Sequence, residues 1–395
     1  MKNESAYLTV SYAAVQFFFW FVYGTALAYA SPYLLSCGLN NTMIGLISAA
    51  ACFLSVILQP GLAAYADRES SLSVKAILML AAGGMAGFGA LLSLAYGRGG
   101  ALNGLLLGLS ILLIQLALPF SNALATETIN QGKKLQFSLA RGFGSIGYAV
   151  MSVTMGRLIA RHGAPAEPYA LIATSLCFLA TIALFPFRKA REEKKDAPAA
   201  SGGALAFLRR YPAFAVTLLG CVLIYISHVC INNFVYQIVV PRGGDSRHMG
   251  TAMALAGLLE VLTMFFFSRL LKWKRADFWF RISGVFFTFK ALGTLLAPSM
   301  GVFYLVQVFQ PLGWGLMTVS SVVYVNSIMQ PQDRIKGQAY MTMSLSVATI
   351  LGSLGGGFLI DALGVNGMLV FAVACGAAGT LIVMRRKEKQ ALNAP

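Results

Sequence analysis

The sequence predicts an all-α membrane protein with about twelve transmembrane helices, arranged as two six-helix bundles. The first observation is composition: of the 395 residues, 57% are hydrophobic and only 11% are charged, and the mean hydropathy is +0.71. A soluble protein averages about 25% charged residues. The second observation is a regular series of long apolar segments, and the third is an alternation of basic and charge-poor loops between them.

The apolar segments are long enough to cross a bilayer, which requires about 20 apolar residues in a helix. Short polar stretches separate them, and one longer polar stretch, at 188–210, divides the series into two equal sets. The predicted helices span 8–36, 42–64, 74–97, 101–128, 136–160, 167–187, 212–240, 249–271, 278–298, 301–328, 336–361 and 366–384.

The orientation follows from the basic residues, because loops rich in Lys and Arg stay in the cytoplasm. Alternate loops carry clusters of them, whereas the loops in between hold only scattered cations such as Arg98, Arg161 and Arg242. The clusters are Arg68 with Lys75, Lys133 with Lys134, the stretch from Arg188 to Arg210, Arg269 to Arg275, Arg334 with Lys336, and the tail from Arg385 to Lys387. Both termini are therefore expected in the cytoplasm.

The formal net charge of +16 comes largely from these clusters, and their placement between apolar segments argues against a nucleic-acid partner. The six cysteines lie in or at the edges of apolar segments, and none belongs to a CxxC or Cys/His pattern. We expect them to be free thiols. We also expect no metal site and no cofactor. The predicted partners are the lipid bilayer, a small-molecule substrate and protons.

The polar stretch divides the chain into an N-terminal bundle (1–187), a cytoplasmic linker (188–211) and a C-terminal bundle with a short basic tail (212–395). The charge and the Pro, Ala and Gly content of the linker are typical of a solvated segment. A weak internal repeat supports the two halves. Gly156–Gly163 and Gly357–Gly364 both fit the pattern G-x-L-I-x-x-x-G and end the fifth and eleventh segments. Parallel repeats are typical of secondary transporters.

Ionisable residues inside apolar segments are expensive to bury, so each one is a candidate functional residue. Arg141 begins the fifth segment and Glu127 ends the fourth. His228 lies in the seventh segment, Glu260 midway along the eighth and Lys290 midway along the ninth. Because Arg141 has no acid beside it in the sequence, we expect it either to have a partner elsewhere in the fold or to face water.

Glu260 is the only acid near the middle of any segment in the C-terminal half. Burial would make its carboxyl protonatable near neutral pH, and a cation such as Lys290 would reverse that effect. Two interpretations stay open: a proton-coupling residue, or a static Glu260–Lys290 pair that holds two helices together. His228 titrates in a suitable range, and it fits either a proton carrier or a neutral hydrogen-bonding side chain. Glu127 is a further candidate for proton coupling.

Polar and aromatic residues in the segments are candidates for binding a small polar solute. Aromatic faces and amides suit a sugar or a nucleoside, whereas Arg141 or Lys290 would pair with a carboxylate. His228, Asn232 and Tyr236 are spaced i, i+4 and i+8, which places them on one face of a helix. The candidate substrate-binding residues are Arg141, Trp20, Tyr23, Gln115, Asn122, Asn233, Tyr236, Gln307, Gln310 and Trp314.

A short motif lies between the second and third segments, in the stretch QPGLAAYADRESSLSVK (59–75). Gly61, Asp67 and Arg68 resemble the G-x-x-x-D-R signature of the major facilitator superfamily, with a longer spacing and with Lys75 as a more distant trailing basic residue. The resemblance implies a latch between neighbouring helices on the cytoplasmic side. An ordinary charged loop is the alternative.

The chain as a whole resembles the branch of that superfamily that contains lactose permease and the phenylpropionate permeases, which are oligosaccharide:proton symporter-like. The stretch VQFFFWFVYGTALAYASPYLL resembles its aromatic first helix, FSLARGFGSIGYA its arginine-bearing fifth helix, and AGLLEVLTMFF the glutamate-bearing eighth helix of the phenylpropionate-like members. The resemblance implies the MFS fold, with Arg141 facing a central aqueous cavity as a substrate-binding residue. It also implies that Lys290 occupies the place of a functional arginine.

This sequence departs from lactose permease at several functional positions. An acid of its fourth helix corresponds to Ala123 here, with Glu127 one turn later, and a His and a Glu of its tenth helix correspond to Gln310 and Gly313. These differences argue against galactoside recognition and against the lactose-type proton site. Coupling through Glu260 would be a different arrangement within the same fold.

The predicted function is secondary active transport by alternating access, as proton-coupled symport of a sugar, a nucleoside or a small organic acid. A proton-driven exporter of drugs or metabolites is the alternative, and a non-transporting membrane sensor is a remote one. No enzyme is predicted, because the chain has no HExxH, GxSxG or P-loop motif and no cluster of intramembrane carboxylates or histidines. The compact loops and short tails favour a multi-pass protein of the bacterial inner membrane, and a monomer is expected.

Overall fold

The computed structural model describes residues 2–66, 68, 71–187 and 203–385. All regular secondary structure in this part of the chain is helical. The prediction of an all-α protein is therefore confirmed.

The N-terminal half begins with a broken first helix: α1 (Lys2–Tyr23), a π-helical turn η1 (Gly24–Ala28) and α2 (Ala30–Ser36). The following helices are continuous. They are α3 (Asn41–Ala66), α4 (Val74–Ala95), α5 (Gly100–Asn130), α6 (Phe137–His162) and α7 (Ala166–Leu184).

Local sequence explains several of these helix ends. The Ser73 side chain accepts a hydrogen bond from the backbone N–H of Ala76 at 3.2 Å and so caps α4. Gly163, with φ +78°, follows the last residue of α6, in a conformation that disfavours side chains with a Cβ. Pro165 then precedes α7, where its fixed φ suits the start of a helix.

The C-terminal half contains two broken helices. One consists of α9 (Pro212–Asn233), α10 (Val235–Val239) and η2 (Val240–Arg242). The other consists of α13 (Met300–Val306), the π-helical turn η3 (Pro311–Gly315) and α14 (Leu316–Ile328). The remaining elements are α8 (Ala204–Arg210), α11 (Ser246–Trp273), α12 (Ala276–Leu296), η4 (Pro331–Asp333) and α15 (Arg334–Arg385).

In the described part of the chain, nine helical stretches are long and apolar enough to cross a membrane. The predicted segments 249–271 and 278–298 correspond to α11 and α12, which are not among the nine. The segments 336–361 and 366–384 both lie in α15, where Gly364 interrupts the helix with φ 75° and ψ 176°. A total of twelve spans therefore stays a prediction.

The chain forms two compact units. Unit 1 comprises Met1–Arg191, Asn233–Leu258 and Ser353–Ala362, and unit 2 comprises the rest. Unit 1 thus contains the whole predicted N-terminal bundle together with two pieces of the C-terminal half. Residues 188–202 of the predicted linker lie outside the described residues.

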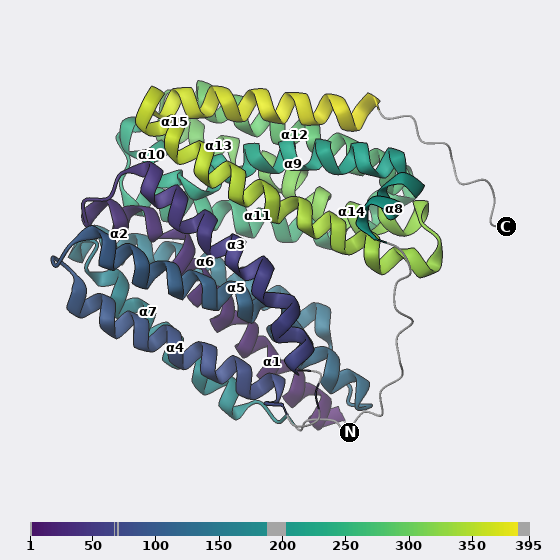
Figure 1. Ribbon diagram of the computed structural model, residues 1–395, viewed down its shortest axis with the longest axis horizontal. Coiled ribbons are helices and arrows are strands. Elements are labelled where there is room, and N and C mark those ends of the chain that lie inside the picture. The colour runs from purple at the N-terminus through teal and green to yellow at the C-terminus, as the bar shows by residue number, and fades with distance from the viewer. Residues whose placement is uncertain (1, 67, 69–70, 188–202, 386–395) are drawn as a thin grey trace. The chain divides into compact units, whose positions relative to one another are not determined.

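Within unit 1, α4 packs against α5 and α7, and α1 packs against α6 and α7 (Figure 1). The interior is aromatic: Phe19 and Phe178 have no exposed surface, and their rings meet edge to face with centroids 5.6 Å apart. Within unit 2, α12 packs against α14 and η3. Because lipid tails are as apolar as these interiors, van der Waals contact and hydrogen bonds hold the helices together.

Candidate solute-binding and proton-coupling residues

Aromatic side chains surround His228 in unit 2. The imidazole of His228, on α9, stacks on the Trp314 ring with centroids 4.6 Å apart and 16° between the ring planes. Phe287 of α12 contacts His228 edge-on at 5.4 Å, and Tyr225 contacts Trp314 at 6.0 Å. With Lys290 and Gln310 these four residues form what we call the C-terminal cluster.

The π-helical turn η3 presents Trp314 to this cluster. Pro311 begins the turn and has no N–H to donate, which weakens a regular α-helix at this point. The hydroxyl of Thr263, on α11, donates to the Pro311 carbonyl at 3.0 Å. Gln307, predicted to bind solute, donates instead to the Phe303 carbonyl of its own helix at 3.1 Å. Single π-helical turns occur frequently at functional sites.

Three of the predicted residues meet at the cationic side of the C-terminal cluster. Lys290 Nζ donates to Gln310 Oε1 at 2.5 Å, and both side chains are buried. Glu260 of α11 is half-buried and acts electrostatically on the Lys290 ammonium. An added Cβ at Gly315 would lie 3.5 Å from Glu260 Cγ, which places the acid beside the end of η3.

The two ring nitrogens of His228 have different surroundings. Nε2 lies 3.3 Å from Asn232 Nδ2, as the i, i+4 spacing predicts. Nδ1 is buried without a hydrogen-bond partner among the described residues. A buried polar atom in this condition costs about 1–3 kcal/mol. A solute that offers a hydrogen-bonding group at Nδ1 would recover this cost.

The expectation that Tyr236 shares the His228 face is wrong. Helix α9 ends at Asn233, and Phe234 leaves helical geometry with φ −119° and ψ 28°. Tyr236 therefore lies on the separate helix α10, in unit 1. Asn233 also belongs to unit 1, where its Nδ2 donates to Ser353 Oγ at 2.8 Å.

A cation lies on an aromatic face in unit 1 as well. The Arg141 guanidinium, from α6, lies over the Trp20 ring of α1 at 4.6 Å from the centroid, and Tyr23 packs on Trp20 with centroids 4.9 Å apart. The helices approach closely because Gly144 has no side chain: an added Cβ would lie 2.9 Å from Trp20 Nε1 and 3.0 Å from Arg141 Nη1. Trp20 Nε1 is buried without a hydrogen-bond partner among the described residues.

A polar network near this site was not predicted from the sequence. Gln16 Nε2 donates to Tyr12 Oη at 2.6 Å and to Ser121 Oγ at 3.0 Å, and Tyr12 Oη donates to the Ser121 carbonyl. Arg141 acts electrostatically on the Tyr12 hydroxyl. The network joins α1 to α5. A lone glutamine in a strongly aromatic segment was the only sequence signal for it.

The other predicted residues of α5 have varied surroundings. Gln115 Oε1 accepts from Ser55 Oγ at 3.1 Å, and its carbonyl accepts from Gln59 Nε2 at 3.3 Å, so it joins α5 to α3. Asn122 and Glu127 are half-buried farther along α5.

The motif between α3 and α4 is only partly described. Asp67 lies outside the described residues, whereas Gly61 and Arg68 are exposed near the end of α3. Lys75, the trailing basic residue, donates through Nζ to two carbonyls at the end of α7, each at 2.8 Å. This contact joins α4 to α7. A latch formed by Gly61, Asp67 and Arg68 stays a prediction.

Four residues of unit 1 form a hydrogen-bonded clasp that was not predicted. The Asp361 carboxylate accepts from the backbone N–H and side chain of both Asn41 and Thr42, at 2.6–3.2 Å, and so caps the start of α3. Gln237 Nε2 donates to Asn41 Oδ1 at 2.8 Å. Asp361 lies inside the Gly357–Gly364 repeat, which was the only sequence signal for this position.

A second close contact in unit 1 involves glycines of α6 and α11. Tyr29 Oη donates to the Ser152 carbonyl of α6 at 2.5 Å, and Ser246 Oγ of α11 donates to the Gly156 carbonyl at 3.0 Å. An added Cβ at Gly250 would overlap the Ser152 carbonyl oxygen and lie 2.7 Å from Tyr29 Oη. Backbones can approach this closely only where small residues face each other. We call this contact the α6–α11 crossing.

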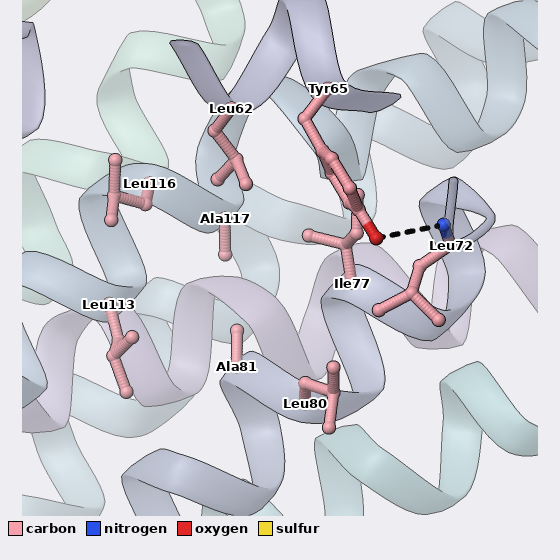
Figure 2. A pocket seen from close by; sticks show the side chains of 9 residues that line it. All are labelled: Leu62, Tyr65, Leu72, Ile77, Leu80, Ala81, Leu113, Leu116 and Ala117. Atoms are coloured by element: carbon pink, nitrogen blue, oxygen red, sulfur yellow. Dashed lines mark hydrogen bonds between the residues drawn. The ribbon is translucent and has the colours of Figure 1, made fainter. Parts of the chain in front are cut away.

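A hollow of about 240 Å³ lies among α3, α4 and α5 (Figure 2). Its lining is almost entirely aliphatic. The polar groups drawn there are the Tyr65 hydroxyl and the backbone N–H of Leu72, which donates to it at 3.4 Å. None of the predicted site residues lines it. A polar solute would find few hydrogen-bonding groups in this hollow, so we do not regard it as the solute site.

The fold, which in the described part of the chain has nine helical stretches long and apolar enough to cross a membrane, is typical of multi-pass membrane transporters. The chain belongs to the MFS_1 like family, which it matches over residues 9–372. No curated protein matches the chain in sequence. The family and the structural neighbours are transporters, not enzymes.

Several solved structures share the fold over nearly the whole chain. A mutant form of the nucleoside transporter NupG has a TM-score of 0.84 at 14% identity, covering 96% of this chain and 100% of the NupG chain. A D-xylose-proton symporter has a TM-score of 0.71 at 13% identity, covering 98% and 99%. A POT family transporter has a TM-score of 0.73 at 14% identity, covering 95% of each chain. At these identities the likeness establishes the MFS fold alone, and it confirms the resemblance to the major facilitator superfamily.

Proposed function

We propose that this protein is a proton-coupled symporter that moves a small polar solute by alternating access. The proposal rests on one arrangement that occurs in each unit. A cation lies near an aromatic side chain, and a buried ring nitrogen there has no hydrogen-bond partner among the described residues. Arg141 lies on Trp20 in unit 1, and in unit 2 Lys290 acts electrostatically on His228, which stacks on Trp314. At both places a buried ring nitrogen has no hydrogen-bond partner in the described part of the chain, which structural packing alone does not account for.

These groups suit a solute with a ring and several hydrogen-bonding groups. The Trp20 and Trp314 rings offer flat faces, and Trp20 Nε1 is a donor that a hydroxyl or carbonyl oxygen would satisfy. Sugars and nucleosides have these features, and a small organic acid would also pair with Arg141 or Lys290. The names of two fold relatives, a nucleoside transporter and a D-xylose-proton symporter, agree with this range.

Proton coupling is assigned to Glu260 together with Lys290. When a conformational change separates an acid from a cation inside membrane helices, the acid takes up a proton, and it releases the proton when the two groups meet again. Gln310 holds Lys290 in place through the hydrogen bond at 2.5 Å. His228 and Glu127 remain further candidates for the proton path. Tyr23 and Asn122 in unit 1, and Gln307 in unit 2, are further candidates for solute contacts.

We place the protein in the bacterial inner membrane as a monomer, with both termini in the cytoplasm. Proton-driven export of a drug or metabolite is the second candidate, and it would use the same groups with the opposite direction of net transport.

The test is the external pH of de-energised cells that overexpress the protein, after addition of sugars, nucleosides and aromatic acids in turn. We expect alkalinisation with one class of solute, and we expect Glu260→Gln to abolish it. Glu4→Gln is the matched control, because Glu4 is an exposed acid at the start of α1. A folded protein that alkalinises the medium with none of the compounds would contradict symport and favour export.

A further inference from the structure

Helix α8, the short helix labelled in Figure 1, and the start of α15 together form a surface patch in unit 2. We define this α8–α15 patch as residues 204–211 and 330–340. The stretches Pro212–Asn233 and Pro331–Arg385 are each long and apolar enough to cross a membrane, and the patch lies where both of them begin. The patch is therefore at the boundary between the bilayer and water.

Aromatic contacts hold α8 on α15. Phe207 of α8 is only 4% exposed, and its ring stacks on that of Tyr340 with centroids 5.1 Å apart and 28° between the ring planes. The Lys336 ammonium lies 5.2 Å from the centre of the Phe207 ring. A cation at this distance from a ring is attracted to its face. The seven-residue helix α8 thus has a fixed place beside the first turns of α15.

The acid of the patch is engaged within it. Asp333 Oδ2 lies 3.2 Å from Arg210 Nη1, and it accepts a hydrogen bond from the Tyr211 hydroxyl at 2.8 Å. Asp333 is the one acid among residues 204–211 and 330–340, which also contain four basic residues, so the patch has a net charge of +3. An excess of positive charge at a membrane boundary attracts anionic lipids.

The exposed side chains of the patch alternate between basic and apolar. Arg209 and Arg334, which adjoin the Arg210–Asp333 pair in the sequence, are both exposed. Ile335 is 85% exposed and Leu205 is 63% exposed. Leu205 and Arg209 are four residues apart in α8, so they share one face of that helix. Helices that lie in the interfacial region of a bilayer combine apolar and basic side chains in this way.

We propose that the α8–α15 patch binds an anionic phospholipid of the leaflet that faces it. The phosphate oxygens of the lipid accept hydrogen bonds from the guanidinium groups of Arg209 and Arg334. The Leu205 and Ile335 side chains lie among the upper parts of the acyl chains, which removes their exposed apolar surface from water. The binding site does not involve the residues assigned to solute or protons, so the proposal is independent of symport.

The test measures lipid preference at the patch itself. The full-length protein is placed in nanodiscs that contain equal amounts of phosphatidylglycerol and phosphatidylcholine. One of the two lipids carries a photoreactive diazirine near the top of an acyl chain, and a second preparation carries the diazirine on the other lipid. Mass spectrometry then locates the crosslinks on residues 204–211 and 330–340. The preference is the crosslinked yield with phosphatidylglycerol divided by that with phosphatidylcholine.

We expect a preference of at least about 25-fold for phosphatidylglycerol, because each basic side chain near an anionic lipid surface contributes about fivefold. Arg209→Gln with Arg334→Gln should lower the preference by about 25-fold. The matched control is Arg98→Gln with Arg161→Gln, which also removes two exposed arginines but from loops outside the patch. This control should keep the full preference.

A second measurement needs no variant. At about 1 M salt the Debye length is only about 3 Å, so the preference of the unmodified protein should fall towards one. Equal crosslinking of the two lipids at low salt, or a preference that the two glutamines leave unchanged, would overturn the proposal. Inorganic phosphate is added in excess, at an ionic strength matched with chloride. Loss of the phosphatidylglycerol crosslinks under that condition would assign the patch to free phosphate and overturn its assignment to lipid.

Discussion

Substitution of Gly250 by alanine tests the α6–α11 crossing directly. The new Cβ would lie 2.7 Å from Tyr29 Oη and nearer still to the Ser152 carbonyl oxygen. Ordinary contacts of a Cβ begin at 3.4 Å, so the hydroxyl alone would have to retreat by 3.4 − 2.7 = 0.7 Å. The Ser152 oxygen belongs to the backbone of α6 and cannot turn away as a flexible side chain does. The helices must therefore separate.

The cost of forcing one extra carbon into a packed contact is about 1–3 kcal/mol. If an open arrangement accommodates the methyl group, this free energy shifts the equilibrium between closed and open crossings by about 5- to 150-fold towards the open form. We expect the same increase in the rate at which a maleimide modifies Ser31→Cys at fixed pH, because Ser31 is buried in this structure and lies two residues after Tyr29, whose hydroxyl is part of the crossing.

The matched control is Gly257→Ala on the same helix. An added Cβ at Gly257 has as its nearest neighbour the Tyr148 side chain, at 3.5 Å, which is ordinary van der Waals contact. Both substitutions change one glycine of α11 to alanine, so helix propensity cancels in the comparison. Equal modification rates in the two alanine variants would refute the claim that the Gly250 contact keeps the crossing closed.

Two further substitutions test the other contacts. Arg141→Lys keeps the charge but loses the planar stacking on Trp20, which is worth about 0.5–2 kcal/mol. We therefore expect the substrate KM to rise about 2- to 30-fold in uptake assays. An unchanged KM would mean that Arg141 does not contact the solute. Asp361→Asn replaces one of the two acceptor oxygens that receive hydrogen bonds from Asn41 and Thr42. Each lost hydrogen bond costs about 1 kcal/mol, so the clasp should weaken. We expect a maleimide to modify Ser31→Cys at least about threefold faster in this variant. A rate equal to that of the parent variant would show that the clasp does not limit opening.

The buried polar residues could be predicted from the sequence because they are conspicuous in an apolar chain. Glu260, Lys290 and Gln310 come from three different predicted helices, and the structure brings them together. Arg141 and Trp20 likewise come from the fifth and first predicted helices and stack. Ionisable side chains are costly to expose to lipid, so they face the interior of the helix bundle and pair with one another. Their presence in apolar segments is therefore enough to predict that they lie together inside the protein.

The helix breaks could not be predicted in the same way. Periodicity assumes a continuous helix, and the segment from His228 to Tyr236 contains no Pro or Gly that would indicate an interruption. The chain nevertheless leaves helical geometry at Phe234, whose side chain is completely buried. Tertiary packing rather than local propensity sets this break, and the face assigned to Tyr236 was wrong for that reason.

Glu167 is a second residue whose surroundings could not be predicted from the sequence. The predicted sixth helix begins at residue 167, and a carboxylate at that boundary would normally face water. In the structure, the π-helical turn η1 ends the straight run of the first helix, and Tyr29 and Tyr33 follow it as buried residues that act on Glu167. The turn at Gly163 meanwhile places the start of α7 directly after α6. An acid at an expected surface position is thus a buried group, which the spacing of polar residues does not show.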